Sequence, residues 1–164
     1  MQQMQYRTDL NRVDLGLAML RVVVGVIFVA HGAQKLFEYG LGNVATNFGK
    51  MGIPAASVTG PLVALVEFFG GLGLIGGLLT RLSGLGLSIN MLGAIVFVHL
   101  SKGLMGPGGF EFPLALLAAG ATLAVTGAGR YSLDHFIAAR RRHTTSAVAH
   151  ERRRGERRRG SQAA

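Results

Sequence analysis

The sequence predicts an all-α integral membrane protein, a four-helix transmembrane bundle followed by a disordered basic C-terminal tail. Four segments are apolar and long enough to cross a bilayer core of about 30 Å, for which about 20 helical residues are needed. They are residues 15–37, 61–79, 82–100 and 112–126. Glycine is abundant, at 25 of 164 residues, as is common in transmembrane helices. Ten of the 17 basic residues follow Gly129, and all ten are arginine.

Each span has its own polar content. Arg21 lies inside the first span and Glu67 inside the second, whereas the third and fourth spans carry no charge. The fourth span is short, so we allow it to begin at Glu111 or to end near Gly129.

A soluble four-helix bundle would need a polar face on every helix, which the third and fourth spans lack. The first span is too long and too charged for a signal peptide, so we expect it to be retained.

Lysine and arginine in the flanking segments set the expected orientation. They are more numerous in the N-terminal segment, at Arg81 and in the tail than in the segments of residues 38–60 and 101–111. We therefore expect both termini to be cytoplasmic and these two segments to be loops that face outward. The chain divides into an N-terminal segment, a transmembrane domain and a tail. Their expected bounds are 1–14, 15–135 and 136–164.

The tail is rich in arginine and poor in apolar residues, so it cannot bury a core and is expected to be disordered. Basic residues near a membrane gain about 1 kcal/mol each from anionic lipid, which is the partner we expect for the tail. Nucleic-acid binding is disfavoured, because no aromatic residue is interleaved with the arginines there.

The charged residues of the first two spans share helical faces with glycines. The first face is spaced by four, three, four and three residues, with His31 beside it: Arg21, Gly25, Phe28, Gly32 and Lys35. The second begins at Glu67, and Gly73 and Gly77 form a GxxxG pair of the kind that lets helices approach closely. We therefore expect these two faces to meet inside the bundle.

The partner of Glu67 stays open in the sequence. Arginine supplies five donors, which makes a network of Arg21, Asn90 and Glu67 feasible, but Lys35 is an equally suitable partner. A second polar group is expected at the outer end of the bundle: His31, Lys35, His99 and Glu111. Asn90 and His99 are nine residues apart, about 180° on a helix, so they can face one narrow site only if the third span is surrounded.

Each of these residues also has a purely structural interpretation. Arg21 and Lys35 can extend to the membrane interfaces, Asn90 can join two helices by a hydrogen bond, and Glu111 can favour a helix start.

The charged residues, glycines and their spacing together resemble the DoxX family over about residues 15–135. The matching motifs are Arg21-x3-Gly25-x2-Phe28-x2-His31-Gly32-x2-Lys35-Leu36, Gly52-Ile53-Pro54, Glu67-x2-Gly70-Gly71, Gly76 through Arg81, Ala94 with His99, and Gly127-Ala128-Gly129-Arg130-Tyr131-Ser132-Leu133-Asp134. The resemblance implies a four-helix protein of the bacterial cytoplasmic membrane. It also implies thiosulfate-to-quinone electron transfer, or resistance to redox, quinone or thiol stress. The arginine tail goes beyond the family pattern.

A quinone-interacting redox subunit is the function that we favour. Quinone reduction consumes protons, which histidine and a buried carboxyl group can deliver, while a cation stabilises developing negative charge. The expected catalytic residues are Glu67, His31, Arg21 and Lys35, and the expected quinone-binding residues are Asn90, His99 and Glu111. No metal site is expected. The chain has no cysteine, so a sulfur relay on its own thiols is excluded.

Two other functions stay open. A non-catalytic anchor for soluble redox enzymes would use the polar residues as interhelical contacts and the tail for docking. A small-molecule transporter would use the ionisable groups at the outer end as a gate, although four spans are few for a carrier and no inverted repeat is evident. A homo-oligomer is compatible with each.

Overall fold

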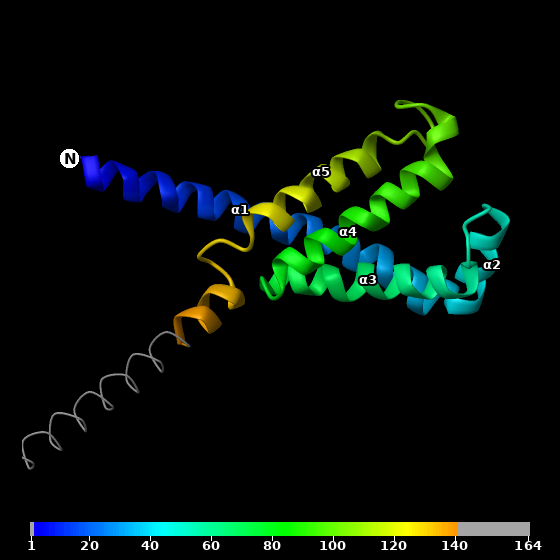
Figure 1. Cartoon of the computed structure of the whole chain (residues 1–164), viewed down its shortest axis with the longest axis horizontal. Coiled ribbons are helices and arrows are strands. Elements are labelled where there is room, and N and C mark those ends of the chain that lie inside the picture. Colours follow the sequence, from blue (N-terminus) through cyan, green and yellow to red (C-terminus); the bar gives the residue numbers. More distant parts are fainter. Residues whose placement is uncertain (1, 141–164) are drawn as a thin grey trace, which may run out of the picture.

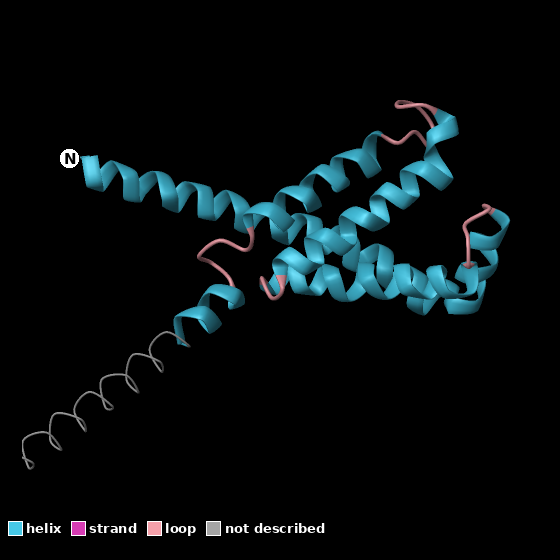
Figure 2. Ribbon diagram, viewed as in Figure 1, coloured by secondary structure: helices cyan, strands magenta, loops and turns pink. Residues whose placement is uncertain are grey.

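The computed structural model of the chain describes residues 2–140, with side chains from residue 10 onward. Its regular elements are all helices, and residues 2–140 contain no strand (Figures 1 and 2). In chain order they are α1 (Gln2–Ala33), the π-helix η1 (Gln34–Tyr39), α2 (Leu41–Lys50), α3 (Ala56–Gly76), α4 (Thr80–Ala94), the π-helix η2 (Ile95–His99), the 3₁₀-helix η3 (Leu100–Lys102) and α5 (Glu111–Thr126). A further helical segment covers residues 133–140.

The long helices pack as two pairs, α1 with α3 and α4 with α5. The turn at residues 77–79 joins α3 to α4, which also pack on each other, and the two pairs diverge from this turn toward the right of Figure 1. We call the end that holds this turn and the loop of residues 127–132 the arginine end. The opposite end, with α2 and the loop of residues 103–110, is the pocket end.

Glycines bring the backbones of each pair into close contact. A Cβ atom at Gly25 of α1 would lie 2.7 Å from the carbonyl oxygen of Gly71 on α3. A Cβ atom at Gly84 of α4 would lie 2.7 Å from the carbonyl oxygen of Gly120 on α5. No larger side chain fits at either crossing without moving a backbone. The prediction that the glycine-bearing faces of the first two spans meet is therefore confirmed.

The predicted GxxxG pair has a different role from the one expected. Gly77 has a φ of 66° and is the C-cap of α3, a left-handed conformation that glycine adopts at little cost. A Cβ atom at Gly73 would lie 2.7 Å from Oγ of Ser83, on the other side of the same turn. The two glycines thus shape the connection between α3 and α4, and the crossing of α1 with α3 uses other glycines.

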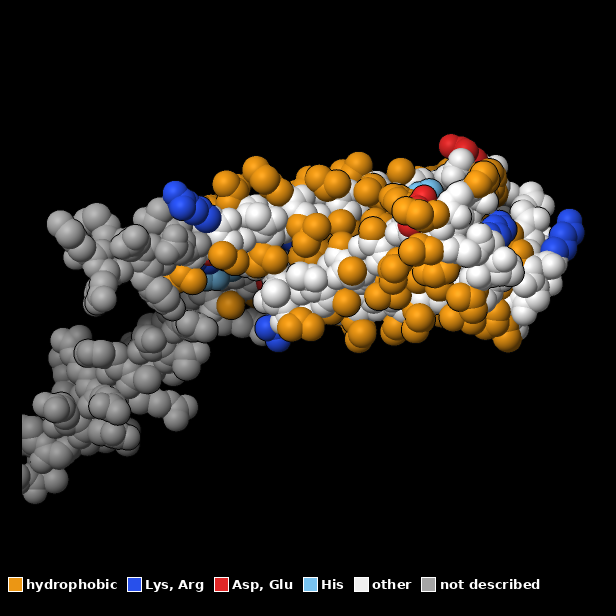
Figure 3. All heavy atoms as spheres, turned by 90° about the horizontal axis from the view of Figure 1, so that it is seen from above, with side chains coloured by type: hydrophobic (Ala, Val, Ile, Leu, Met, Phe, Trp, Pro, Cys, Tyr) orange, Lys and Arg blue, Asp and Glu red, His pale blue; other side chains and the backbone are white. Residues whose placement is uncertain are grey.

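Large apolar side chains face outward along the helices. Val23 is 59% exposed, Phe69 60% and Val125 78%. Figure 3 shows hydrophobic side chains over the middle of the visible face and Lys and Arg side chains toward its ends. A continuous apolar surface of this size suits contact with lipid chains.

Three helical stretches are long and apolar enough to cross a membrane: Leu10–Tyr39, Ala56–Gly76 and Thr80–Lys102. The fourth apolar helix, Glu111–Thr126, is shorter. It begins at Glu111, one of the two extensions that the sequence allows. The other helices begin earlier than predicted, because hydropathy marks the lipid-facing part of a helix and backbone hydrogen bonds set its ends.

The expected outward loop at residues 38–60 contains a helix that the sequence does not predict. This helix, α2, packs on α3 and buries Val44. With ten residues, two of them glycine, it is only half as long as a membrane span, so a search for long apolar segments does not detect it. Residues 136–140, at the start of the predicted tail, are helical, and residues 141–164 lie outside the described part of the chain.

Candidate functional site

A cavity of about 720 Å³ lies at the pocket end, where the two helix pairs diverge. Its walls come from α1, η1, α2, α3, α4, η2, α5 and the loop of residues 103–110. Most of the lining is apolar, with Phe28, Met91 and Leu116 among its buried members. Six of the seven candidate residues also line it: His31, Lys35, Glu67, Asn90, His99 and Glu111. The fold therefore gathers into one apolar chamber polar residues that are spread over 81 positions of the chain, from 31 to 111.

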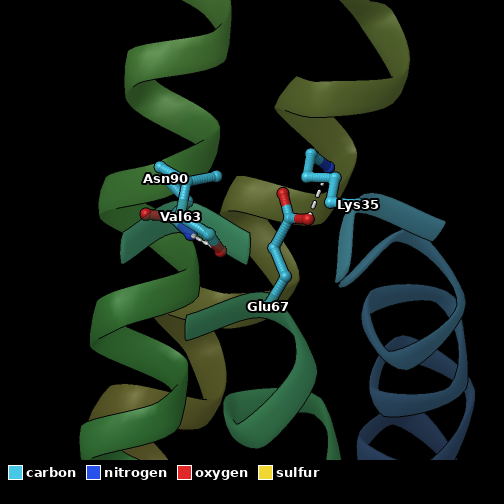
Figure 4. A network of polar contacts seen from close by, with 4 residues as sticks. All are labelled: Lys35, Val63, Glu67 and Asn90. Carbon is cyan, nitrogen blue, oxygen red and sulfur yellow. Dashed lines mark hydrogen bonds and ion pairs between the residues drawn. The ribbon is translucent and has the colours of Figure 1, made fainter. Parts of the chain in front are cut away.

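An ion pair between Lys35 and Glu67 is the strongest polar contact in this cavity. Nζ of Lys35 donates a hydrogen bond to Oε2 of Glu67 at 2.5 Å, and the two side chains are 21% and 4% exposed. Figure 4 shows the side chains extending toward each other from η1 and α3. Of the two partners that the sequence leaves open for Glu67, the structure selects Lys35. A buried carboxylate with a charged donor at this distance satisfies the usual requirement for burying a charge.

Two π-helical segments border the cavity. Lys35 is the second residue of η1, and His99 is the last residue of η2. A π-helix turns through a smaller angle per residue than an α-helix, and such segments are common at functional sites. The expected separation of about 180° between Asn90 and His99 assumes a regular α-helix, and the wider turns of η2 lie between these two residues. Both residues line the same cavity.

The remaining polar residues take different places around the cavity. Nδ2 of Asn90 lies 3.4 Å from the carbonyl oxygen of Val63, a long hydrogen bond that links α4 to α3 (Figure 4). Nδ1 of His99 lies 2.7 Å from the carbonyl oxygen of Gly108. His31 is exposed, and Glu111 begins α5. Among the described side chains, those of residues 10–140, no three His, Asp or Glu are grouped so that they could hold a metal ion.

Arg21 lies at the arginine end and does not line the cavity. The residue is buried, at 3% exposure, and its guanidinium binds backbone oxygens of the loop that follows α5. Nη1 donates to the carbonyl oxygen of Ala128 at 3.2 Å, and Nη2 donates to that of Tyr131 at 2.6 Å. The predicted network of Arg21, Asn90 and Glu67 does not form among the described residues, because both terminal nitrogens of the arginine bind these carbonyl groups at its own end of the bundle.

Asp134 completes this arrangement by holding the turn between α3 and α4. Its two carboxylate oxygens accept hydrogen bonds from the backbone amides of Leu79 and Thr80, at 2.9 and 3.0 Å. Its own amide donates to the carbonyl oxygen of Gly77 at 2.9 Å. These contacts satisfy amides at the start of α4, which the helix itself leaves unpaired. The sequence gives no local signal for them, since Asp134 lies 55 residues after Leu79.

Several known proteins are similar in sequence to this chain over most of its length. The family model described as DoxX matches residues 16–100. The "Putative oxidoreductase CatD" of Bacillus subtilis is 35% identical over 124 residues, which cover 76% of this chain and 88% of that protein. The "Uncharacterized membrane protein Rv3486" of Mycobacterium tuberculosis is 35% identical over 134 residues, covering 74% and 80%. The "Inner membrane protein YqjF" of Escherichia coli is 32% identical over 126 residues, covering 76% and 93%. No solved structure gives a significant match.

Proposed function

The chain belongs to the DoxX family of membrane proteins, and from this premise we propose that it is a quinone-interacting subunit of a redox or stress-response system in the bacterial cytoplasmic membrane. The observation that supports this most is the Lys35–Glu67 ion pair inside an apolar cavity. An ion pair placed there is available to a ligand that arrives from lipid. The name of the Bacillus subtilis relative, an oxidoreductase, points in the same direction.

The cavity is suited to a quinone in size and in polarity. Its volume of about 720 Å³ falls within the range of about 300–1,000 Å³ that small-molecule sites occupy. Phe28, Met91 and Phe97 supply apolar and aromatic surface for a ring. A quinone bound here would supply the electron-accepting chemistry, which takes up two electrons and two protons.

The residues of the cavity have distinct roles in this proposal. The Lys35 ammonium has hydrogens beyond the one given to Glu67, and these can be donated to a carbonyl oxygen of the ligand. The Glu67 carboxylate fixes the position of Lys35 and accepts or releases a proton through it. His31, exposed and on the same cavity wall, can exchange protons with the surroundings. Arg21 has no part in these steps, because it binds the loop at the opposite end.

The electrons come from another protein in this proposal. The chain contains no cysteine, so any thiol chemistry that feeds the site requires a partner that carries the thiol.

Glu67→Gln should weaken the binding of a short-chain benzoquinone, such as duroquinone, by about tenfold, a change of about 1.4 kcal/mol. The amide has no charge with which to hold Lys35 and no proton to exchange. The measurement is the change in quinone absorbance on titration into the purified protein in nanodiscs. Glu38→Gln is the matched control, since Glu38 is an exposed glutamate of η1 that does not line the cavity. Equal affinities of wild type and Glu67→Gln for duroquinone would contradict the proposed function.

We also propose that α5 is a fourth, short membrane span and that both termini lie on the cytoplasmic side. Arg12, Arg81 and Arg130 belong to the arginine end, whereas Lys50 and Lys102 belong to the pocket end. The side with more basic residues is usually cytoplasmic. Alkaline phosphatase, which is active only outside the cytoplasm, should therefore be active when fused after residue 105 and inactive after residue 140. The reverse pattern would contradict the proposed orientation and place both termini outside the cytoplasm.

A further inference from the structure

We infer that the cavity opens sideways into the hydrocarbon core of the bilayer, between α3 and α4, and that Gly93 keeps this opening wide enough for an apolar chain. The ligand that fits such a cavity is a quinone with one long apolar chain, whose ring lies inside while the chain passes out into the lipid. The inference rests on the proposed function, because it concerns the same cavity and extends the chemistry of its ligand.

α3 and α4 are in close contact from their connecting turn as far as Asn90. Near the turn, a Cβ atom added at Gly70 of α3 would lie 3.3 Å from Cγ of Leu87 on α4. Farther from the turn, Nδ2 of Asn90 lies 3.4 Å from the carbonyl oxygen of Val63. This hydrogen bond, which Figure 4 shows, joins the two helices at the border of the cavity.

The wall of the cavity has a gap one helical turn beyond this hydrogen bond, where the two helix pairs diverge (Figure 1). Gly93 lines the cavity, and a Cβ atom added there would meet no atom of the described residues within 4 Å. A glycine that packs against a neighbouring helix shows the opposite, as at Gly25, where an added Cβ atom would lie 2.7 Å from a backbone oxygen. Gly93 therefore leaves space in the wall and does not serve a close helix contact.

Exposed apolar side chains surround this gap. Leu62 of α3, Ile89 of α4 and Phe97 of η2 line the cavity and are also exposed. Ile89 and Gly93 are four residues apart, so they lie on the same face of α4. An apolar rim of this kind is unfavourable in water and suits contact with lipid chains.

The gap lies at the depth of the hydrocarbon core. Gly93 is 13 residues after Thr80, the first residue of α4, which corresponds to about 20 Å of helix. It belongs to the stretch Thr80–Lys102, which is long and apolar enough to cross the membrane. The hydrocarbon core is about 30 Å thick, so at this depth the rim meets acyl chains.

The other border of the cavity has a different chemistry. It lies between α1 and α5, since α1 packs on α3 and α5 packs on α4. His31 of α1 and Glu111 of α5 line the cavity on this side, and both are exposed. Ionisable groups lose solvation when an apolar chain covers them, so the chain is expected to leave between α3 and α4.

An opening into lipid removes the need to enclose the whole ligand. The chain of a membrane-dissolved quinone exchanges one apolar environment for another when it moves from the bilayer to the rim, so this transfer changes the free energy little. The ring alone has to enter the cavity and reach the Lys35–Glu67 ion pair.

The test compares duroquinone with a decyl derivative in which one of its methyl groups is extended to a chain of ten carbons. Both are titrated into the full-length protein in nanodiscs, and their concentrations are expressed per lipid so that partitioning into the bilayer cancels. Wild type should bind the two quinones within about threefold of each other. Gly93→Leu should weaken binding of the decyl derivative at least tenfold more than binding of duroquinone, because leucine fills the gap through which the chain passes.

Gly16→Leu is the matched control. Gly16 lies on α1, does not line the cavity, and also has no atom of the described residues within 4 Å of an added Cβ. The substitution should leave both affinities within about twofold of wild type.

A fluorescence measurement tests the opening without any quinone. The chain has no tryptophan, so the fluorescence of Phe97→Trp reports on the rim alone. Lipids brominated in the middle of their acyl chains should quench this fluorescence strongly. They should quench that of Phe110→Trp less, because Phe110 ends the loop of residues 103–110 at the pocket end.

The outcomes distinguish this inference from the proposed function. A wild-type protein that binds duroquinone but discriminates against the decyl derivative by more than threefold overturns the opening, while the proposed function stands. Equal effects of Gly93→Leu on the two quinones overturn the role of Gly93. If neither quinone binds to wild type, the proposed function fails. The bromine quenching of Phe97→Trp then decides whether the opening faces lipid, and a weak effect overturns it.

Discussion

Lys35→Met should destabilise the folded bundle by about 3 kcal/mol. The substitution leaves the Glu67 carboxylate, 4% exposed, without the ammonium that binds it at 2.5 Å. Removing one partner of a buried ion pair costs about 3–5 kcal/mol, because an uncompensated charge stays behind. The lower end applies here, since Lys35 itself is partly exposed. Unfolding of the purified protein by sodium dodecyl sulfate in mixed micelles, followed by circular dichroism, measures the change.

A double variant distinguishes the cost of an unpaired buried charge from the net contribution of the ion pair to the free energy of unfolding. Lys35→Met combined with Glu67→Leu should recover most of the lost stability, because two apolar side chains need no charge compensation in this cavity. Lys50→Met is the control for losing a cation from the same end, since Lys50 is exposed on α2, and it should change stability by less than about 0.5 kcal/mol. A Lys35→Met protein as stable as wild type would contradict the ion pair.

Arg21→Met should release the loop after α5 and reduce stability by about 2–4 kcal/mol. The guanidinium donates to the carbonyl oxygens of Ala128 and Tyr131, and a hydrogen bond with a charged donor contributes about 1.5–3 kcal/mol. Methionine fills similar space but leaves both oxygens without this donor. Trypsin should then cut after Arg130 faster than in wild type, which peptide mass analysis over a time course will show.

Ligand affinity provides the second measurement on the same variant. Because Arg21 lies at the end opposite the cavity, Arg21→Met should leave duroquinone affinity within about twofold of wild type. Arg12→Met, which removes an exposed arginine from the same helix, should alter neither stability nor cleavage. A large loss of quinone affinity in Arg21→Met with normal stability would instead support the catalytic role that the sequence suggests.

The sequence predicts the long helices and the faces on which they meet because both depend on local patterns. Apolar length marks the spans, and the spacing of Gly25 and Gly32 with Arg21 and Lys35 marks one side of the first span, α1 with η1. The choice of partner for Glu67 depends on position along the helix. Arg21 precedes Lys35 by 14 residues, or about 21 Å of helix, so only one of them can reach Glu67.

The contacts that the sequence does not predict involve backbone atoms and changes of helical register. Arg21 binds carbonyl oxygens, which every residue possesses and which therefore give no compositional signal. The π-helical turns of η1 and η2, in which Lys35 and His99 lie, are not indicated by any hydropathic period. The cavity itself arises because two helix pairs diverge, which is a property of the assembled fold.

The contact between Arg21 and the loop after α5 has a consequence for biogenesis. Arg21 is synthesised early, while its two acceptors lie 107 and 110 positions later in the chain. The first helix must therefore enter the bilayer with a cation that has no internal partner yet. A central position would cost about 2.5–3.5 kcal/mol, and the position of Arg21 near one end of the bundle lowers this cost. The carbonyl groups that compensate this cost belong to the part of the domain that leaves the ribosome last. The loop after α5 therefore stabilises a helix that was inserted first.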